Sequence, residues 1–244
     1  IFIFFFSISL QAQNVLIVNN SGTAATGDHV YSDIQSAVDA SVSGDIIQIV
    51  PSPNSYGAAV ITSKTNLKII GAGFNPQLQS EIVPYISVVS SVALRDNSSN
   101  INISGIVVNN IDIENTSNVV IEDSRINTSL VFRENTRDVI LRRSLMYRDI
   151  NSASSNISGI VITNNIFSGE GRSWSIYNAV FDHNLFLRVE LTGNNNTYTN
   201  SIFYNTTIRQ TGSIFVNNYS NQALLSDPSN TGSDNIISSF NGLQ

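Results

Sequence analysis

Apolar and polar positions alternate in short runs that recur along the chain. Such runs begin at Val119, Val139 and Ile160, and each reaches a small polar residue five positions later. Alternation with a period of two predicts β-strands, and the runs are too short for helices. We call the small polar residue the anchor. Successive anchors lie 17 to 21 residues apart, at Ser124, Ser144, Asn165, Asn184, Ser201 and Asn218.

Two apolar positions keep a constant offset from the anchor. Three residues before it stand Ile121, Leu141, Ile162, Phe181, Tyr198 and Phe215. Two residues after it stand Ile126, Met146, Phe167, Phe186 and Phe203. We expect both sets to point inward as columns, with neighbouring strands about 4.8 Å apart. The anchors should lie at a turn, in the left-handed conformation that Asn tolerates, and should bond to each other from coil to coil.

A third strand follows in each repeat. It runs through Leu130 and Phe132, Ile150, Trp174 and Ile176, Val189 and Leu191, and Ile208. Repeats of about twenty residues with three strands and no helical periodicity are typical of β-solenoids. The sequence therefore predicts an all-β fold, a single-stranded right-handed parallel β-helix of triangular section. Eight to ten coils would give a rod roughly 40 to 50 Å long.

The N-terminal end of such a solenoid needs a cap, because it exposes unpaired strand edges. Ser32 to Gln35 matches an S-x-x-Q capping box, and Ile34, Ala37 and Val38 would lie on one face of a short helix. Gly44 and Asp45 should end this helix. Residues 46–50 are then expected as the first strand of the solenoid.

The first ten residues are almost entirely apolar and are followed by Gln11-Ala12-Gln13. This pattern predicts a secretory signal peptide over residues 1–13, incomplete at its start, and a buried strand is the alternative. The run is too short to span a membrane. We expect residues 14–244 to form one β-helix domain that is incomplete at its C-terminus. The predicted location is outside the cell, either secreted or on the cell surface.

Composition narrows the classes of partner. The chain has no Cys, 12% charged residues and a formal net charge of −6. No basic stripe is available to neutralise phosphates, so nucleic acid is not an expected partner. No polybasic anchor favours membrane binding, and the sequence leaves the oligomeric state open.

The opening of the repeat region resembles a known superfamily. The stretch from Tyr31 through Ile34, Ala37, Gly44 and Tyr56 resembles the start of many pectin-lyase-like β-helix proteins. The resemblance covers about residues 30 to 220 and concerns the fold more than the activity. Members include pectate and alginate lyases, polygalacturonases, pectin esterases and binding proteins. The resemblance implies polysaccharide as a partner. We expect no required cofactor, although proteins of this superfamily can use Ca²⁺.

The third strand offers the first candidate site. Alternation would turn one set of polar residues outward along one face: Arg133, Asp149, Tyr177, Arg188, Glu190 and Arg209. Arginines, acids and an aromatic ring suit carbohydrate, and a merely soluble face is the alternative. If the face is catalytic, Arg188 or Arg209 is the candidate base of a lyase. Asp149 and Glu190, about 10 Å apart, would be the pair of a hydrolase. Loops 169–172 and 193–196 could form groove walls.

Two further polar clusters lie just before the anchors. Glu122 and Asp123 should meet Arg142 and Arg143 one coil away as ion pairs, which we expect to stabilise rather than catalyse. Residues 181–184, Phe-Asp-His-Asn, resemble the aromatic-x-Asp-His segment of pectate lyases. The accompanying arginine and Ca²⁺-binding motifs of those lyases are absent. His183 is therefore expected at a solvated ladder position, with a catalytic base as the alternative.

An apolar column should also point outward, four residues before the anchors: Val120, Ile140, Val161, Val180, Thr197 and Ile214. It is either an ordinary β-branched ladder or a surface that another segment or chain covers.

The sequence thus predicts an extracellular β-helix that binds polysaccharide or serves as an adhesin segment without catalysis. A polysaccharide lyase or glycoside hydrolase acting on an acidic glycan is the alternative, and a purely structural stalk is the third.

Overall fold

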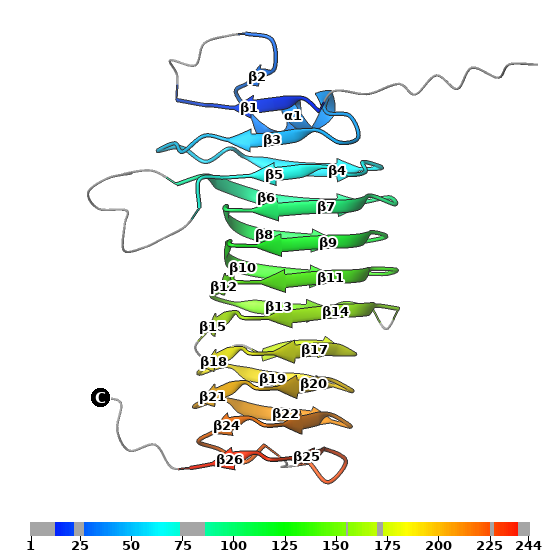
Figure 1. The fold of residues 1–244 in the computed structure, drawn as a ribbon, viewed down its shortest axis with the longest axis vertical. Coiled ribbons are helices and arrows are strands. Elements are labelled where there is room, and N and C mark those ends of the chain that lie inside the picture. The colour runs from blue at the N-terminus through cyan, green and yellow to red at the C-terminus, as the bar shows by residue number, and fades with distance from the viewer. Residues whose placement is uncertain are drawn as a thin grey trace, which may run out of the picture.

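The computed structural model describes residues 13–21, 27–73, 86–154, 156–169, 173–224 and 227–238. The predicted signal peptide, apart from its last residue, lies outside them. The described chain forms a tall stack of about nine parallel coils, with a single short helix near the N-terminal end (Figure 1). No described helix is long and apolar enough to cross a membrane.

One face of the stack is a continuous parallel sheet, which we call the first sheet. Each coil adds one strand to it, and every described pair is parallel. Its members, in spatial order, are β2 (Val30–Tyr31), β1 (Val15–Val18), β3 (Ile46–Ile49), β5 (Lys68–Ile70), β7 (Ser99–Ser104), β9 (Ser117–Glu122), β11 (Arg137–Arg142), β14 (Ser158–Thr163), β17 (Ala179–Asp182), β20 (Thr197–Thr199), β23 (Ile214–Val216) and β25 (Thr231–Ser233).

The other two faces merge in the N-terminal half and separate further along the chain. Four strands serve the merged region: β4 (Ala58–Thr62), β6 (Val88–Arg95), β8 (Val107–Ile113) and β10 (Arg125–Phe132). From there one row of strands forms what we call the short-strand face: β12 (Leu145–Met146), β15 (Ile166–Ser168), β18 (Leu185–Leu187), β21 (Ile202–Tyr204), β24 (Tyr219–Ser220) and β26 (Ile236–Ile237). The other row forms the third-strand face: β13 (Asp149–Ser152), β16 (Ser173–Tyr177), β19 (Glu190–Asn194) and β22 (Thr207–Thr211). The predicted right-handed parallel β-helix with three strands per coil is confirmed.

Both predicted inward columns are confirmed. In the first sheet Ile121 pairs with Leu141, and the column continues through Ile162, Phe181 and Tyr198. Phe167, Phe186 and Phe203 are in register on the short-strand face. All of these side chains are buried. Within each column the aromatic rings stack, with 4.8 Å between the centroids of Phe186 and Phe203. This column packing sets the register of every outward side chain, because alternation fixes which face each residue takes.

The anchors form the predicted hydrogen-bonded ladder inside the turn after the first sheet. The backbone N–H of Ser144 donates to Asn165 Oδ1, and that of Asn165 donates to Asn184 Oδ1 (2.9 and 3.0 Å). The predicted backbone conformation was one position off. The left-handed residue is the one before each anchor, for example Arg143 and His183 at φ 50° and 54°. Its side chain therefore points outward, while the anchor points into the core.

The N-terminal cap is a helix, α1 (Ile34–Ala40), whose Ile34, Ala37 and Val38 are buried as predicted. The predicted capping box is wrong. Asp33 caps the helix by accepting from the backbone N–H of Ser36 (2.8 Å). The Gln35 side chain instead pairs with both backbone polar groups of Val60 in β4. The helix thereby covers an edge that would otherwise expose unpaired backbone groups. A strand not foreseen from the pattern, β1, precedes the predicted first strand β3.

Candidate functional site

The third-strand face places most of the predicted site residues outward. The residues expected to point inward, Phe132, Ile150, Ile176, Val189 and Ile208, are buried. Asp149 and Glu190 occupy one outward column on strands two coils apart, because β16 lies between β13 and β19. Arg209 lies in the next outward column along the strands. Tyr177 lies in the column after that one. Arg133, directly after β10, belongs to the same column as Tyr177. Five of the six predicted residues therefore lie outward on or directly beside this face, in three columns.

Two parts of the prediction need correction. Arg188 is not on a strand of this face but at the corner before β19, where its backbone is left-handed (φ 56°). Residues 193–196 are not one loop, because Gly193 and Asn194 belong to β19 and Asn196 is buried, but Asn194 and Asn195 do line a hollow on this face. Gly193 has no room for a side chain, since an added Cβ would meet the carbonyl oxygen of Ile176. Residues 170–172 of the other predicted wall lie outside the described residues.

The arginines of this face are paired with acids. Arg209 Nε lies 3.1 Å from Glu190 Oε1, and the Arg209 side chain is 70% exposed. Arg133 Nε contacts both carboxylate oxygens of Asp112 (2.8 and 2.9 Å), which also contacts Arg95. Hydrogen bonding to Asp112 raises the pKa of Arg133. The exposed guanidinium of Arg209 keeps further donors toward solvent, because a guanidinium has five N–H groups.

A hollow of about 450 Å³ opens beside Tyr177 at the end of this face. The Tyr177 ring is half-buried, and its hydroxyl accepts from Ser175 Oγ (3.1 Å). The rest of the lining is small or amide-bearing: Ser152, Ala153, Ser154, Asn178, Asn194 and Asn195. An aromatic ring among amides and hydroxyls offers both stacking and hydrogen bonding. Sequence reasoning found Tyr177 and named Asn194 and Asn195 within a possible groove wall, but it missed Asn178 and the residues of the preceding coil, Ser152 to Ser154.

The predicted ion pairs at the edge of the first sheet are confirmed. Glu122 Oε2 lies 2.7 Å from both Arg142 and Arg143, and Arg143 also contacts Asp123 at 2.7 Å. Partial burial opposes ionisation of Glu122, but hydrogen bonds from Asn102, Arg142 and Arg143 outweigh it and lower its pKa. Each charge of this cluster has a partner, so the cluster stabilises adjacent coils and offers no unpaired group for catalysis.

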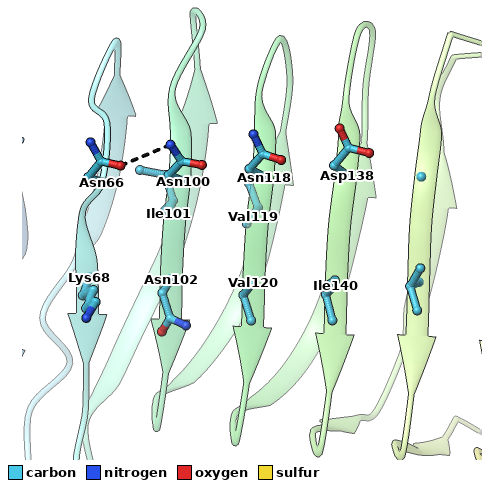
Figure 2. A pocket seen from close by; sticks show the side chains of 12 residues that line it. Asn66, Lys68, Asn100, Ile101, Asn102, Asn118, Val119, Val120, Asp138 and Ile140 are labelled. Atoms are coloured by element: carbon cyan, nitrogen blue, oxygen red, sulfur yellow. Dashed lines mark hydrogen bonds between the residues drawn. The ribbon is translucent and has the colours of Figure 1, made fainter. Parts of the chain in front are cut away.

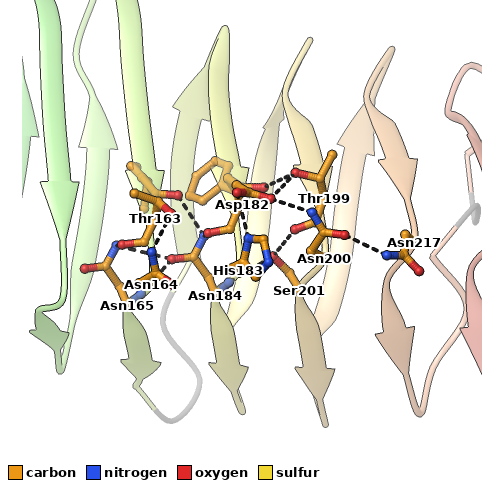
Figure 3. A network of polar contacts seen from close by, with 12 residues as sticks. Thr163, Asn164, Asn165, Asp182, His183, Asn184, Thr199, Asn200, Ser201 and Asn217 are labelled. Carbon is orange, nitrogen blue, oxygen red and sulfur yellow. Dashed lines mark hydrogen bonds and ion pairs between the residues drawn. The ribbon is translucent and has the colours of Figure 1, made fainter.

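Asp182 and His183 form a second polar network at the same edge (Figure 3). Asp182 Oδ2 lies 2.7 Å from His183 Nδ1. Asp182 Oδ1 accepts from Thr199 Oγ1 and Asn200 Nδ2 of the next coil (2.6 and 2.8 Å). Partial burial raises the pKa of Asp182, but the hydrogen bonds from Thr199, Asn200 and His183 together outweigh burial and lower the pKa overall. The solvated ladder position predicted for His183 is confirmed, since its side chain is 58% exposed.

A hollow of about 680 Å³ is a shallow groove on the outer surface of the first sheet (Figure 2). The predicted outward apolar column forms its floor, with Val120, Ile140 and Val161. Asn66, Asn100, Asn118 and Asp138 stand in a row along one side. Each of these four has a left-handed backbone. The sequence predicted the apolar floor but not the row of corner residues beside it.

No group of three or more acidic or His side chains that could hold a metal ion occurs among the described residues. Ca²⁺ use thus stays an expectation of the resemblance alone.

No protein-family model and no curated protein matches the chain. Similar solved structures include the A-module of a mannuronan C-5 epimerase from Azotobacter vinelandii (15% identity over 78% of this chain and 70% of that chain, TM-score 0.48). Another is a pectin methylesterase in complex with a hexasaccharide (11% identity over 89% of this chain and 92% of that chain, TM-score 0.47). A third is an alginate lyase from Paenibacillus (10% identity over 91% of this chain and 99% of that chain, TM-score 0.44). By its own parallel ladders, this chain has the right-handed parallel β-helix fold that the sequence predicts.

Proposed function

We propose that this protein binds an extended acidic polysaccharide along its third-strand face, outside the cell. The observation that carries the proposal is the hollow beside Tyr177, where an aromatic ring is surrounded by amide and hydroxyl groups. A sugar ring stacked on Tyr177 would place its hydroxyls within reach of Asn178, Asn194 and Asn195. The proposed location outside the cell, as a secreted or surface adhesin segment, draws its support from the apolar leader of the sequence.

The spacing of the coils supports an extended sugar chain as the ligand. Outward side chains repeat every 4.8 Å or so along the stack, close to the length of one sugar unit, whereas an extended peptide advances only about 3.3 Å per residue. Successive coils can therefore address successive sugars. Arg209 lies one coil beyond the strand of Glu190, and its exposed guanidinium is available to a uronate carboxylate.

An enzymatic function has weaker support on this face. Asp149 and Glu190 are arranged as the sequence predicts, but Glu190 is bound by Arg209. A hydrolase of the proposed kind needs both carboxyl groups to act at the glycosidic bond, and the Glu190 carboxylate is already engaged by Arg209. Binding without catalysis is therefore the function that this geometry supports best.

Replacement of Tyr177 by Ala should weaken binding of acidic polysaccharide by about tenfold or more, the value of a lost ring contact of roughly 1.5 kcal/mol. Affinity electrophoresis in gels that contain pectate, alginate or a neutral glucan would measure this loss of affinity at low and high salt. The matched control is Tyr147→Ala, because Tyr147 is exposed on the short-strand face.

Equal retardation of the wild type and Tyr177→Ala in every gel would contradict the proposal. The same incubations, with and without Ca²⁺, should yield no new unsaturated or reducing ends. Their appearance would establish the lyase or hydrolase alternative.

A further inference from the structure

We propose that His183 is a general base in a second site, at the corner after the first sheet, that hydrolyses small acyl esters. This activity goes beyond glycan binding and does not depend on the third-strand face. Figure 3 shows the polar network that includes His183, and its side chains come from four successive coils.

The first observation is that the imidazole is held in one orientation. Asp182 contacts Nδ1, and Thr199 and Asn200 of the next coil fix the carboxylate in turn. A carboxylate at Nδ1 selects the tautomer that carries its proton there, which leaves Nε2 as a proton acceptor. No described residue contacts Nε2, and the exposed side chain opens it to water and substrate.

The second observation is a shallow hollow of about 360 Å³ in front of the imidazole. Its lining includes the apolar side chains of Ile166, Leu185 and Ile202, one from each of three successive coils. An acyl methyl group fits this apolar floor, and the volume lies within the range of small-molecule sites.

The third observation is a pair of amides on either side of His183. Asn164 and Asn200 occupy the same corner position on the preceding and following coils, about 4.8 Å away. One hydrogen of Asn164 Nδ2 goes to Thr163 Oγ1, and one of Asn200 Nδ2 goes to Asp182. Each amide nitrogen has a second hydrogen that no described residue accepts. Because the two amides stand on opposite sides of the imidazole, a single oxyanion can contact only one of them, and Asn164, which is bound only to the adjacent Thr163, is the donor that can stabilise it.

The reaction follows from these three parts. Nε2 of His183 takes a proton from a water molecule, while the water oxygen forms a bond to the acyl carbon. The carbonyl oxygen becomes an oxyanion beside Asn164. The intermediate then collapses, the bond from the acyl carbon to the alcohol oxygen breaks, and the alcohol takes its proton from the imidazolium. The products are a carboxylic acid and an alcohol, and the neutral imidazole is restored. His183 is the catalytic residue, and Asp182 is a positioning residue.

The chain offers a matched control, because its second histidine, His29, is also exposed and also has a left-handed backbone (φ 68°). We would compare His183→Asn with His29→Asn, since Asn occupies the His183 position in neighbouring coils and tolerates this conformation. The probe is p-nitrophenyl acetate, followed by release of p-nitrophenolate. We expect His183→Asn to lower the protein-dependent rate at least tenfold. General-base catalysis contributes roughly 10²-fold or more, so a tenfold loss is the smallest effect consistent with this role. His29→Asn should keep the wild-type rate.

Two further variants test the assigned roles. Asp182→Asn should lower kcat and leave KM unchanged, because it removes the orientation of the ring but not the hollow. Asn164→Ala should also lower kcat, since it removes one donor to the oxyanion. Equal rates for His183→Asn and His29→Asn, or a wild-type rate no greater than that of the same concentration of free imidazole, would overturn the proposal. Circular dichroism at matched temperatures shows whether each variant is folded before its rate is compared.

Discussion

At the scale of single residues, Tyr198 is the most unusual side chain of the core. It is completely buried between the rings of Phe181 and Phe215, and its hydroxyl has no hydrogen-bond partner among the described residues. Its two neighbours in the column are Phe, so the ring itself fits the stack while the hydroxyl adds an unsatisfied polar atom. Such an atom costs about 1–3 kcal/mol.

Replacement of Tyr198 by Phe should therefore raise the free energy of unfolding by about 1 kcal/mol. Chemical denaturation with urea, monitored by circular dichroism, measures the change. Burial also raises the pKa of Tyr198. A folded pKa above the unfolded value of about 10 gives stability that is present below pH 10 and lost as the pH rises further. Tyr198→Phe should lose less stability than the wild type between pH 9 and about 11. A lower midpoint in urea for this variant would show that the hydroxyl has a favourable role.

The sequence predicts which residues point inward more reliably than it predicts backbone conformation. A constant offset from the anchor was enough to place Phe181 and Tyr198 in one buried column. It placed the left-handed residue one position too late, because Asn is common both at anchors and at the corner residues before them. The pattern cannot separate an Asn that bonds inward, such as Asn165, from one at the left-handed corner that points outward, such as Asn164.

At the scale of an element, the anchor ladder holds the turn after the first sheet. Asn165 is buried, and its Nδ2 donates to the carbonyl oxygens of Leu141 and Thr163. Its Oδ1 accepts from the backbone of Ser144. One side chain thus forms hydrogen bonds with polar backbone groups of two coils, and these groups are buried away from water.

Replacement of Asn165 by Ala should lower the free energy of unfolding by about 3 kcal/mol, since it leaves several buried groups unpaired. Asn165→Ser is the conservative comparison, because Ser stands at this position in the coils of Ser144 and Ser201. Asn165→Ser should lower the free energy of unfolding clearly less than Asn165→Ala does. Guanidinium denaturation of both variants measures the difference, and equal losses would mean that volume matters here more than hydrogen bonding.

Element boundaries followed from the pattern only where one strand serves one face. The third strand was found in each coil, but β6, β8 and β10 run through two faces, which alternation alone does not reveal. The capping helix was predicted from its buried face. Its cap was misassigned because Ser32 and Asp33 are both good capping residues, and the contact of Gln35 with β4 is not local in sequence.

At the scale of the whole molecule, each coil contacts mainly its neighbours, so the stack should tolerate the loss of one complete coil. Deletion of residues 184–200 would join His183 to Ser201 and bring Phe181 into register with Phe215. We expect this variant to fold, with a rod about 4.8 Å shorter in small-angle X-ray scattering. Deletion of residues 184–192 removes only part of a coil and should prevent folding, since it breaks both columns. Comparable scattering profiles for the two variants would contradict this account of the stack.

The candidate sites depend on the whole molecule in a way that a single sequence does not display. Tyr177 and Arg209 could be named from alternation within a coil. The hollows beside Tyr177 and His183 could not, because each is lined by residues of three successive coils whose register is set by the coil lengths. The pairing of Arg209 with Glu190 has the same origin.

The corner residues with left-handed backbones have a consequence for how such a surface can change over generations. Their side chains point away from the core, and the requirement placed on them is only that they accept this backbone, which Asp123, Arg143, Asn164 and His183 all do. Mutations there can exchange acid, base, amide and imidazole while the inward columns stay the same. Surface chemistry and folding are therefore under nearly separate selection. A lineage of such proteins could acquire new ligands at its corners without passing through unstable intermediates.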